Sequence, residues 1–92
     1  MGLKGEVFAI VCPAPVINMK EQTKLAIELS LKNARQKHPV FAENLGHALL
    51  LAQEELGEAI QAYNNKDVDG VVKEISHTAA VLVRILNGEF LK

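Results

Sequence analysis

The stretch NLGHALLLAQEELGEAIQAY, residues 44–63, decides the fold of this chain. Its apolar residues recur at intervals of three and four, the spacing that places side chains on one face of an α-helix. The turn-forming residues 64–67, NNKD, follow directly. We therefore predict a helix from about Glu43 or Asn44 to about Tyr63. Its apolar stripe consists of Leu45, Ala48, Leu49, Ala52, Leu56, Ala59, Ile60 and Tyr63.

A second helix is predicted before this stretch, over residues 19–37. Residues 18–21, NMKE, resemble a capping box with Asn18 as the cap, and His38 and Pro39 end the run of good helix formers. The apolar residues of this helix fall on two sides, which predicts burial against the chain's own core and at a subunit interface. One side carries Leu25 and Leu29, and the other carries Ile27, Leu31 and Ala34.

A third helix is predicted after the turn, with Asp67 or Asp69 as its N-cap and Gly88 as its stop after about Asn87. Its expected inner stripe is Val71, Ile75, Thr78, Leu82 and Ile85. Within the central helix, Gly57 costs about 1 kcal/mol relative to alanine, so we expect another backbone or a ligand to approach it closely.

Residues 1–17 form an N-terminal arm, with the apolar run Val7–Cys12 between glycine and proline breaks. No second strand-like segment is available to pair with this run. The arm therefore packs on the helices, pairs with its equivalent in another subunit or remains free, and we favour packing because six apolar residues are costly to expose. The predicted fold is all-α, with three main helices in a domain over residues 18–92 and oligomerisation completing the core.

Length and composition limit the classes of protein to which the chain can belong. A three-helix core in 92 residues is marginal, so we expect a dimer or a tetramer. The net charge of −1 gives no basic excess, and nucleic acid is not an expected partner. A single cysteine, Cys12, favours a reducing, cytoplasmic setting. No apolar run approaches the roughly 20 residues of a membrane span, so a soluble protein is predicted.

Two pairs of potential metal ligands border the apolar stripes. At about 100° per residue, Glu55 and Glu58 fall at one edge of the stripe on the central helix, and Glu74 and His77 have the same offsets on the next. In an antiparallel helix pair these edges converge on a shared cleft, where carboxylates suit a hard divalent cation. Glu54 lies farther from the stripe and is expected to face solvent or to support a ligand. The alternative is that both pairs are ordinary exposed helix residues, with His77 bonded to Glu74.

The stretch from about Lys37 to Leu86 resembles the MazG-like, all-alpha nucleoside triphosphate pyrophosphohydrolase superfamily. The signature of that superfamily is EExxE on one helix and ExxD on the next. The first motif is matched by Glu54, Glu55 and Glu58, and the second by Glu74, with His77 in place of the aspartate. The segments KHPVF at 37–41 and HTAA at 77–80 further resemble small members of phage or mobile-element type.

The resemblance implies a Mg²⁺-dependent enzyme that hydrolyses a nucleoside triphosphate between its α and β phosphates, giving a monophosphate and pyrophosphate. By this mapping Glu54, Glu55 and Glu58 are the catalytic residues, and the metal ligands are Glu55, Glu58, Glu74 and His77. Imidazole is a poor ligand for Mg²⁺ and a better one for Mn²⁺. His77 therefore leaves three possibilities open: an altered metal preference, a contact from His77 to phosphate or to a water, and a fold that has lost the reaction.

Cations near the end of the first helix are candidates for triphosphate binding, although the helix dipole favours cations there in any protein. The candidates are Arg35, Lys37 and His38, with Lys73 beside the second motif. Asn33, Phe41 and Tyr63 can contact a base or belong to the core. The leading prediction is a pyrophosphohydrolase, and the alternatives are a catalytically silent nucleotide-binding or regulatory module and a purely structural helical interaction protein.

Overall fold

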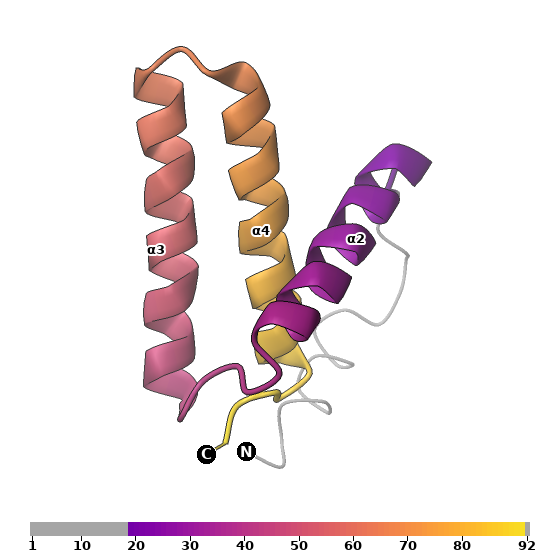
Figure 1. Cartoon of the computed structure of the whole chain (residues 1–92), viewed down its shortest axis with the longest axis vertical. Coiled ribbons are helices and arrows are strands. Elements are labelled where there is room, and N and C mark those ends of the chain that lie inside the picture. The colour runs from indigo at the N-terminus through magenta and orange to yellow at the C-terminus, as the bar shows by residue number, and fades with distance from the viewer. Residues whose placement is uncertain (1–18, 92) are drawn as a thin grey trace, which may run out of the picture.

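The computed structural model describes residues 19–91 of the chain. This part is all-α, with the helices α2 (Glu21–Lys37), α3 (Leu45–Asn64) and α4 (Val68–Leu86) and no strand (Figure 1). The predicted all-α class with three helices is confirmed there. None of these helices is long and apolar enough to cross a membrane. The predicted arm over residues 1–17 lies outside the described residues.

Helices α3 and α4 form an antiparallel hairpin (Figure 1). Each begins with a side-chain cap: Asn44 Oδ1 accepts from His47 N at 2.8 Å, and Asp67 Oδ1 accepts from Gly70 N at 2.9 Å. The predicted cap at Asp67 is confirmed. Between the helices Lys66 has a φ of 60°, which lets the chain reverse within the short turn. Local capping and turn chemistry thus set the bounds of both helices.

Helix α2 begins two residues later than predicted. Its N-cap is Lys20, whose extended backbone precedes the first helical residue and whose side chain makes no capping bond. The prediction of Asn18 as the cap is therefore wrong, and Asn18 itself lies outside the described residues. α2 packs against α4 and not against α3, and its N-terminal half diverges from the hairpin (Figure 1). As a result no residue of α2 is fully buried, and Leu25 and Leu29 are exposed.

The core lies at the end of the bundle where α2 leads into α3 and where α4 ends. Its buried residues are Phe41, Ala42 and Ala48, and half-buried side chains of Leu51, Val81, Ile85 and Phe90 pack against them. The segment after α4 is fastened there, because Ala42 and Phe90 form an isolated parallel bridge and Leu91 N donates to Ala42 O at 2.9 Å. Outside this cluster, the buried apolar residues of the described chain are the alanines Ala59 and Ala80.

Two packing predictions fail. Ile75 and Leu82 of the expected inner stripe are each 46% exposed, while Ala80 and Arg84 are buried. The reason is that α4 packs between two helices, so its buried positions face α3 on one side and α2 on the other, and small side chains allow the close approach. Nothing in the described chain lies within 4 Å of a Cβ built at Gly57, so the expected close approach by another part of the backbone is absent there.

Candidate functional site

Glu55 of α3 meets Glu74 and His77 of α4 across the hairpin. One ligand atom from each residue lies within 4.8 Å of the other two. His77 Nδ1 is 3.0 Å from Glu74 Oε1 and 3.5 Å from Glu55 Oε2. His77 follows Glu74 by about one helical turn on the same face of α4, and the antiparallel packing brings this face against Glu55. The structure therefore brings together three of the four predicted metal ligands.

The electrostatics of Glu55 reflect its burial and, after that, crowding by like charges. Burial raises the pKa of its carboxyl group, and the negative charge of Glu58 and a hydrogen bond with Glu74 raise it further, while His77 opposes the shift. Its Oε2 atom is buried and has no hydrogen-bond partner among the described residues. A buried carboxylate oxygen without a donor costs about 1–3 kcal/mol, and more when charged. A cation beside this atom would remove both penalties.

The donor set suits a divalent cation. Two carboxylates supply hard oxygen ligands, and an imidazole nitrogen adds a ligand that Mn²⁺ accepts more readily than Mg²⁺. The hydrogen bond between His77 and Glu74 constrains which ring nitrogen of His77 can coordinate a cation. With Glu74 ionised, its oxygen can only accept, so His77 Nδ1 carries the proton and Nε2 keeps a lone pair. Coordination through Nδ1 would replace this bond.

The remaining motif residues lie outside this group of three. Glu58 is exposed and acts on Glu55 through its charge. Glu54 is also exposed, on the side of α3 for which solvent contact was expected. Lys73 is exposed and does not line the cavity that adjoins Glu55 and His77. The exposed charges of Glu54 and Glu58 on α3 and of Lys73 on α4 therefore lie outside the group of three.

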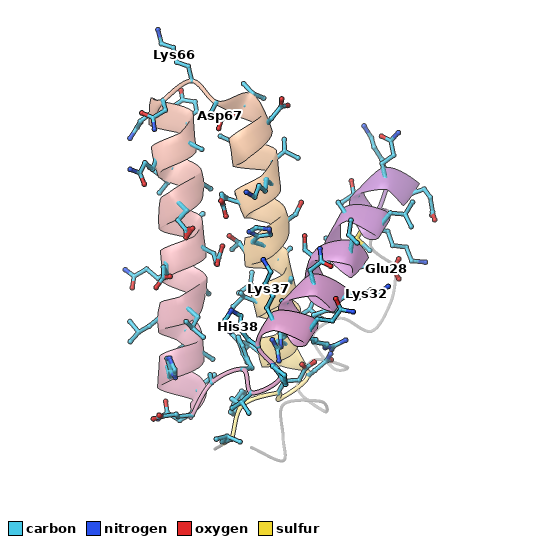
Figure 2. The ribbon with its side chains drawn as sticks, viewed as in Figure 1. Glu28, Lys32, Lys37, His38, Lys66 and Asp67 are labelled. Carbon is cyan, nitrogen blue, oxygen red and sulfur yellow. The ribbon has the colours of Figure 1, made fainter. Side chains whose placement is uncertain are left out.

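A cavity of about 200 Å³ adjoins Glu55 and His77 and extends to the C-terminal end of α2. Lys37 and His38 lie on the side of α2 that faces α4, whereas Glu28 and Lys32 lie on the other side (Figure 2). The cavity therefore has acidic and histidine groups on one wall and potential cations on the other. Its lining residues are Ser30, Asn33, Ala34, Lys37, His38, Glu55, His77, Ala80 and Val81.

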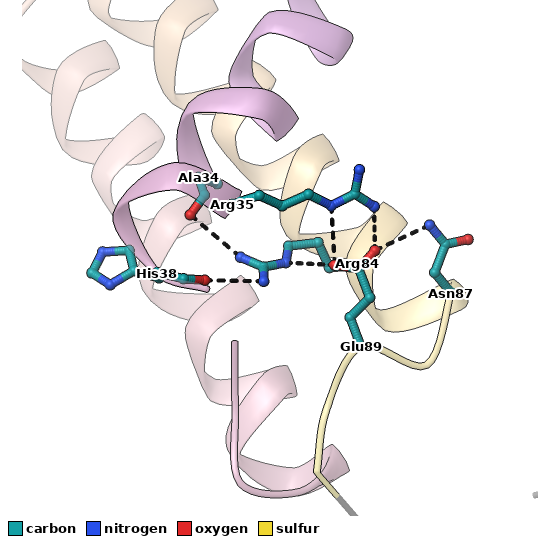
Figure 3. Close-up of polar contacts among 6 residues, drawn as sticks. All are labelled: Ala34, Arg35, His38, Arg84, Asn87 and Glu89. Atoms are coloured by element: carbon teal, nitrogen blue, oxygen red, sulfur yellow. Dashed lines mark hydrogen bonds and ion pairs between the residues drawn. The ribbon is translucent and has the colours of Figure 1, made fainter. Parts of the chain in front are cut away.

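Arg35, the other predicted substrate-binding residue, lies elsewhere. It lines a separate surface hollow and forms an ion pair with Glu89, which also accepts from Arg84 Nε at 3.0 Å and from Asn87 Nδ2 at 3.2 Å (Figure 3). Hydrogen bonds from Arg35, and then from Asn87 and Arg84, lower the pKa of Glu89 to about 2. The hydrogen bond to Glu89 in turn raises the pKa of Arg35. These contacts connect α2 to the segment after α4.

Sequence reasoning missed Arg84, the buried charged residue of the described chain. A signal was present, because Arg84 interrupts the apolar run VLVRIL at residues 81–86, and a charge that is buried within such a run requires partners. The same reasoning did not identify Glu89 as its partner. Among the aromatic residues, Phe41 belongs to the core and Tyr63 is 74% exposed.

Comparisons with protein-family models, with curated proteins and with solved structures found no match to this chain.

Proposed function

We propose that this chain is a metal-dependent nucleoside triphosphate pyrophosphohydrolase built on a MazG-like helical core. The observation that carries the proposal is the convergence of Glu55, Glu74 and His77 within 4.8 Å beside a cavity whose opposite wall holds Lys37 and His38. Cations opposite a metal site are what a triphosphate requires, because its charge must be neutralised at more than one phosphate. The EExxE and ExxH motifs supply the same residues from the sequence.

The residues divide the work between the two walls of the cavity. Glu55, Glu74 and His77 would hold Mg²⁺ or, given the imidazole, Mn²⁺. The cation would neutralise phosphate charge and lower the pKa of a bound water. Lys37 would donate hydrogen bonds to phosphate oxygens from α2, and Ala80 and Val81 line the cavity on α4. Glu54 and Glu58, which the family motif implies as catalytic, are candidates for orienting the attacking water.

The test is release of pyrophosphate from a panel of nucleoside triphosphates with Mg²⁺ and with Mn²⁺. We expect turnover to be faster with Mn²⁺ and to fall by at least about 100-fold in Glu55→Gln, because that variant loses a ligand to the metal. Glu28→Gln is the matched control, since Glu28 lies on the other side of α2 from the cavity (Figure 2), and its activity should stay within about threefold of wild type. Absence of turnover with either metal would refute the enzymatic function.

A silent nucleotide-binding module is the second candidate function. The contact between His77 Nδ1 and Glu74 Oε1 favours it, because a metal bound through Nδ1 would have to replace this contact. In this case nucleotide and Mn²⁺ together raise the melting temperature without hydrolysis. His77→Asp, which restores the ExxD motif, should then tighten Mg²⁺ binding, and His77→Asn serves as a neutral control of similar size. Unchanged Mg²⁺ affinity in His77→Asp would exclude this explanation.

We also propose that the core is completed by a second copy of the chain, as a dimer or a pair of dimers. Exposed apolar side chains recur along α3 at helical spacing, at Leu49, Leu56, Ile60 and Tyr63, and α4 adds Ile75, Leu82 and Leu86. A set of this size on a monomer is costly to expose. Light scattering should give a mass of at least a dimer, and Leu56→Glu with Ile60→Glu should give a monomer. A wild-type monomer at high concentration would refute self-association.

The predicted cytoplasmic location rests on the single cysteine alone.

A further inference from the structure

Arg84 is buried between α4 and the end of α2, with only 3% of its surface exposed. Its guanidinium group donates to oxygens from separate segments of the chain, at 3.0 Å to His38 O, at 3.5 Å to Ala34 O and at 3.0 Å to Glu89 Oε1 (Figure 3). It also lies 4.6 Å from the centroid of the Phe41 ring. A buried guanidinium with this many partners fixes the relative positions of the segments that supply them.

These contacts fasten the C-terminal end of α2. The last carbonyl groups of a helix lack partners within the helix, and cations are favoured beside them. Ala34 O accepts from His38 N at 2.8 Å, and Arg84 adds a donor from α4 to the same carbonyl and to His38 O. Because α2 packs on α4 and not on α3, its position relative to Glu55 on α3 is determined through α4.

The fastened end of α2 is also one wall of the cavity. Lys37 and His38 line the cavity together with Glu55 and His77. On α4, Arg84 follows His77 by two helical turns on the same side, and Ala80 and Val81, which lie between them, form the floor. One side of α4 therefore carries His77, the proposed metal ligand, and, two turns later, Arg84, which holds the opposite wall of the cavity.

We infer that Arg84 is a positioning residue for a polyphosphate ligand, because it holds Lys37 and His38 across the cavity from Glu55 and His77. The size of the cavity supports this ligand class, since about 200 Å³ is smaller than the roughly 300–1,000 Å³ of pockets that enclose whole small molecules, and it suits a phosphate chain. The inference rests on the proposed function, which supplies the metal on the other wall. Arg84 itself acts through α2 and does not contact the ligand.

The experiment compares Arg84→Gln and Arg84→Lys with wild type, using inorganic tripolyphosphate in the presence of MnCl₂, and MnCl₂ alone, as probes in titration calorimetry. Arg84→Gln should weaken tripolyphosphate binding by at least about tenfold, the effect of losing one charge-assisted contact, and should leave the affinity for MnCl₂ alone within about threefold. Arg84→Lys keeps the charge without the planar fork and should give an intermediate loss. If Arg84→Gln does not fold, Arg84→Lys alone decides the question.

The control for a merely structural role is Ala62→Gly, near the opposite end of the hairpin. This substitution lowers helix stability by about 1 kcal/mol without touching α2. It should leave tripolyphosphate binding unchanged. A second readout needs no ligand: hydrogen exchange at the His38 amide should accelerate by about tenfold or more in the Arg84 variants and not in Ala62→Gly. Lys37→Gln should add little to the binding defect of Arg84→Gln, because both act on the same contact.

The outcomes separate this inference from the proposed function. Folded Arg84 variants that bind tripolyphosphate as tightly as wild type would overturn the positioning role. A wild type that binds MnCl₂ but not tripolyphosphate would overturn it as well, while the metal site would survive. A wild type that binds neither probe would refute the proposed function and, with it, the positioning role. Weakened tripolyphosphate binding in Ala62→Gly of the same size would show that the defect is general instability.

Discussion

Replacing Glu55 by glutamine should stabilise the metal-free protein and remove its response to metal. The two effects on stability have opposite signs. Without a cation the carboxylate is repelled by its neighbours and destabilises the fold, whereas with a cation it is a ligand and stabilises the fold. At the upper separation of 4.8 Å between the ligand atoms of Glu55 and Glu74, two unit charges repel by about 3 kcal/mol at an effective dielectric constant of 20 and by about 1 kcal/mol in water. Both side chains are partly exposed, at 26% and 17%, so the true value lies between these limits.

Glutamine keeps the shape of the side chain and adds an amide that can donate to Glu74. We expect a net gain of about 1 kcal/mol in EDTA, because the repulsion between the two carboxylates is removed. For a chain of this length that gain corresponds to a rise of about 4–8 °C in melting temperature. With MnCl₂ at about ten times its dissociation constant, the wild type should gain about 1.4 kcal/mol and the variant much less.

The assay is thermal unfolding followed by circular dichroism, at one protein concentration because self-association would otherwise shift the midpoint. Glu54→Gln is the matched control: it makes the same chemical change at the next residue, which is exposed, and should alter stability by no more than about 0.5 kcal/mol in either condition. A lower melting temperature for Glu55→Gln in EDTA would refute the crowding argument. A response to MnCl₂ equal to that of wild type would show that Glu55 is not a ligand.

Two further predictions concern the turn and the end of α4. Gly70→Ala should lower stability by about 1 kcal/mol, because the added Cβ would overlap the capping carboxylate of Asp67. Gly57→Ala, the same change in open space, should instead raise stability by about 0.5–1 kcal/mol in urea titrations, and equal effects would contradict the argument. The pKa of Glu89 is lowered to about 2, so its ionised form stabilises the fold above the ordinary value of 4.5, and this stability is lost as pH falls through about 2. Glu89→Gln should therefore cost about 1–2 kcal/mol near neutral pH, after allowance for solvent around the 44% exposed Arg35, and almost nothing at pH 2; a difference independent of pH would refute this.

The helices themselves were predictable from the sequence. The structure places α3 and α4 within about two residues of the predicted bounds, and the cap at Asp67 is the predicted one. These features depend on interactions between residues within a few positions of each other, which the sequence displays directly as periodicity, caps and turn residues. The start of α2 was less predictable, because the NMKE pattern has the residue types of a capping box while the chain at Lys20 is still extended.

The candidate site was predictable in part. The angular offsets of Glu55, Glu74 and His77 indicated that they share an edge, and the structure brings them together. The same count placed Glu58 beside them, but it lies outside the group and is exposed. Periodicity gives the direction of a side chain and not its level along the partner helix.

The sequence by itself determined that the described residues 19–91 are all-α, the extents of α3 and α4, and the acidic and histidine residues that these two helices carry. Only the tertiary structure decided that Arg84 is buried, that Arg35 pairs with Glu89 rather than facing the cavity, and that Lys37 and His38 do face it. The physical reason is range. Helix formation follows from neighbours three and four residues apart, whereas the contact of Arg35 with Glu89 joins residues 54 positions apart and depends on how whole helices pack.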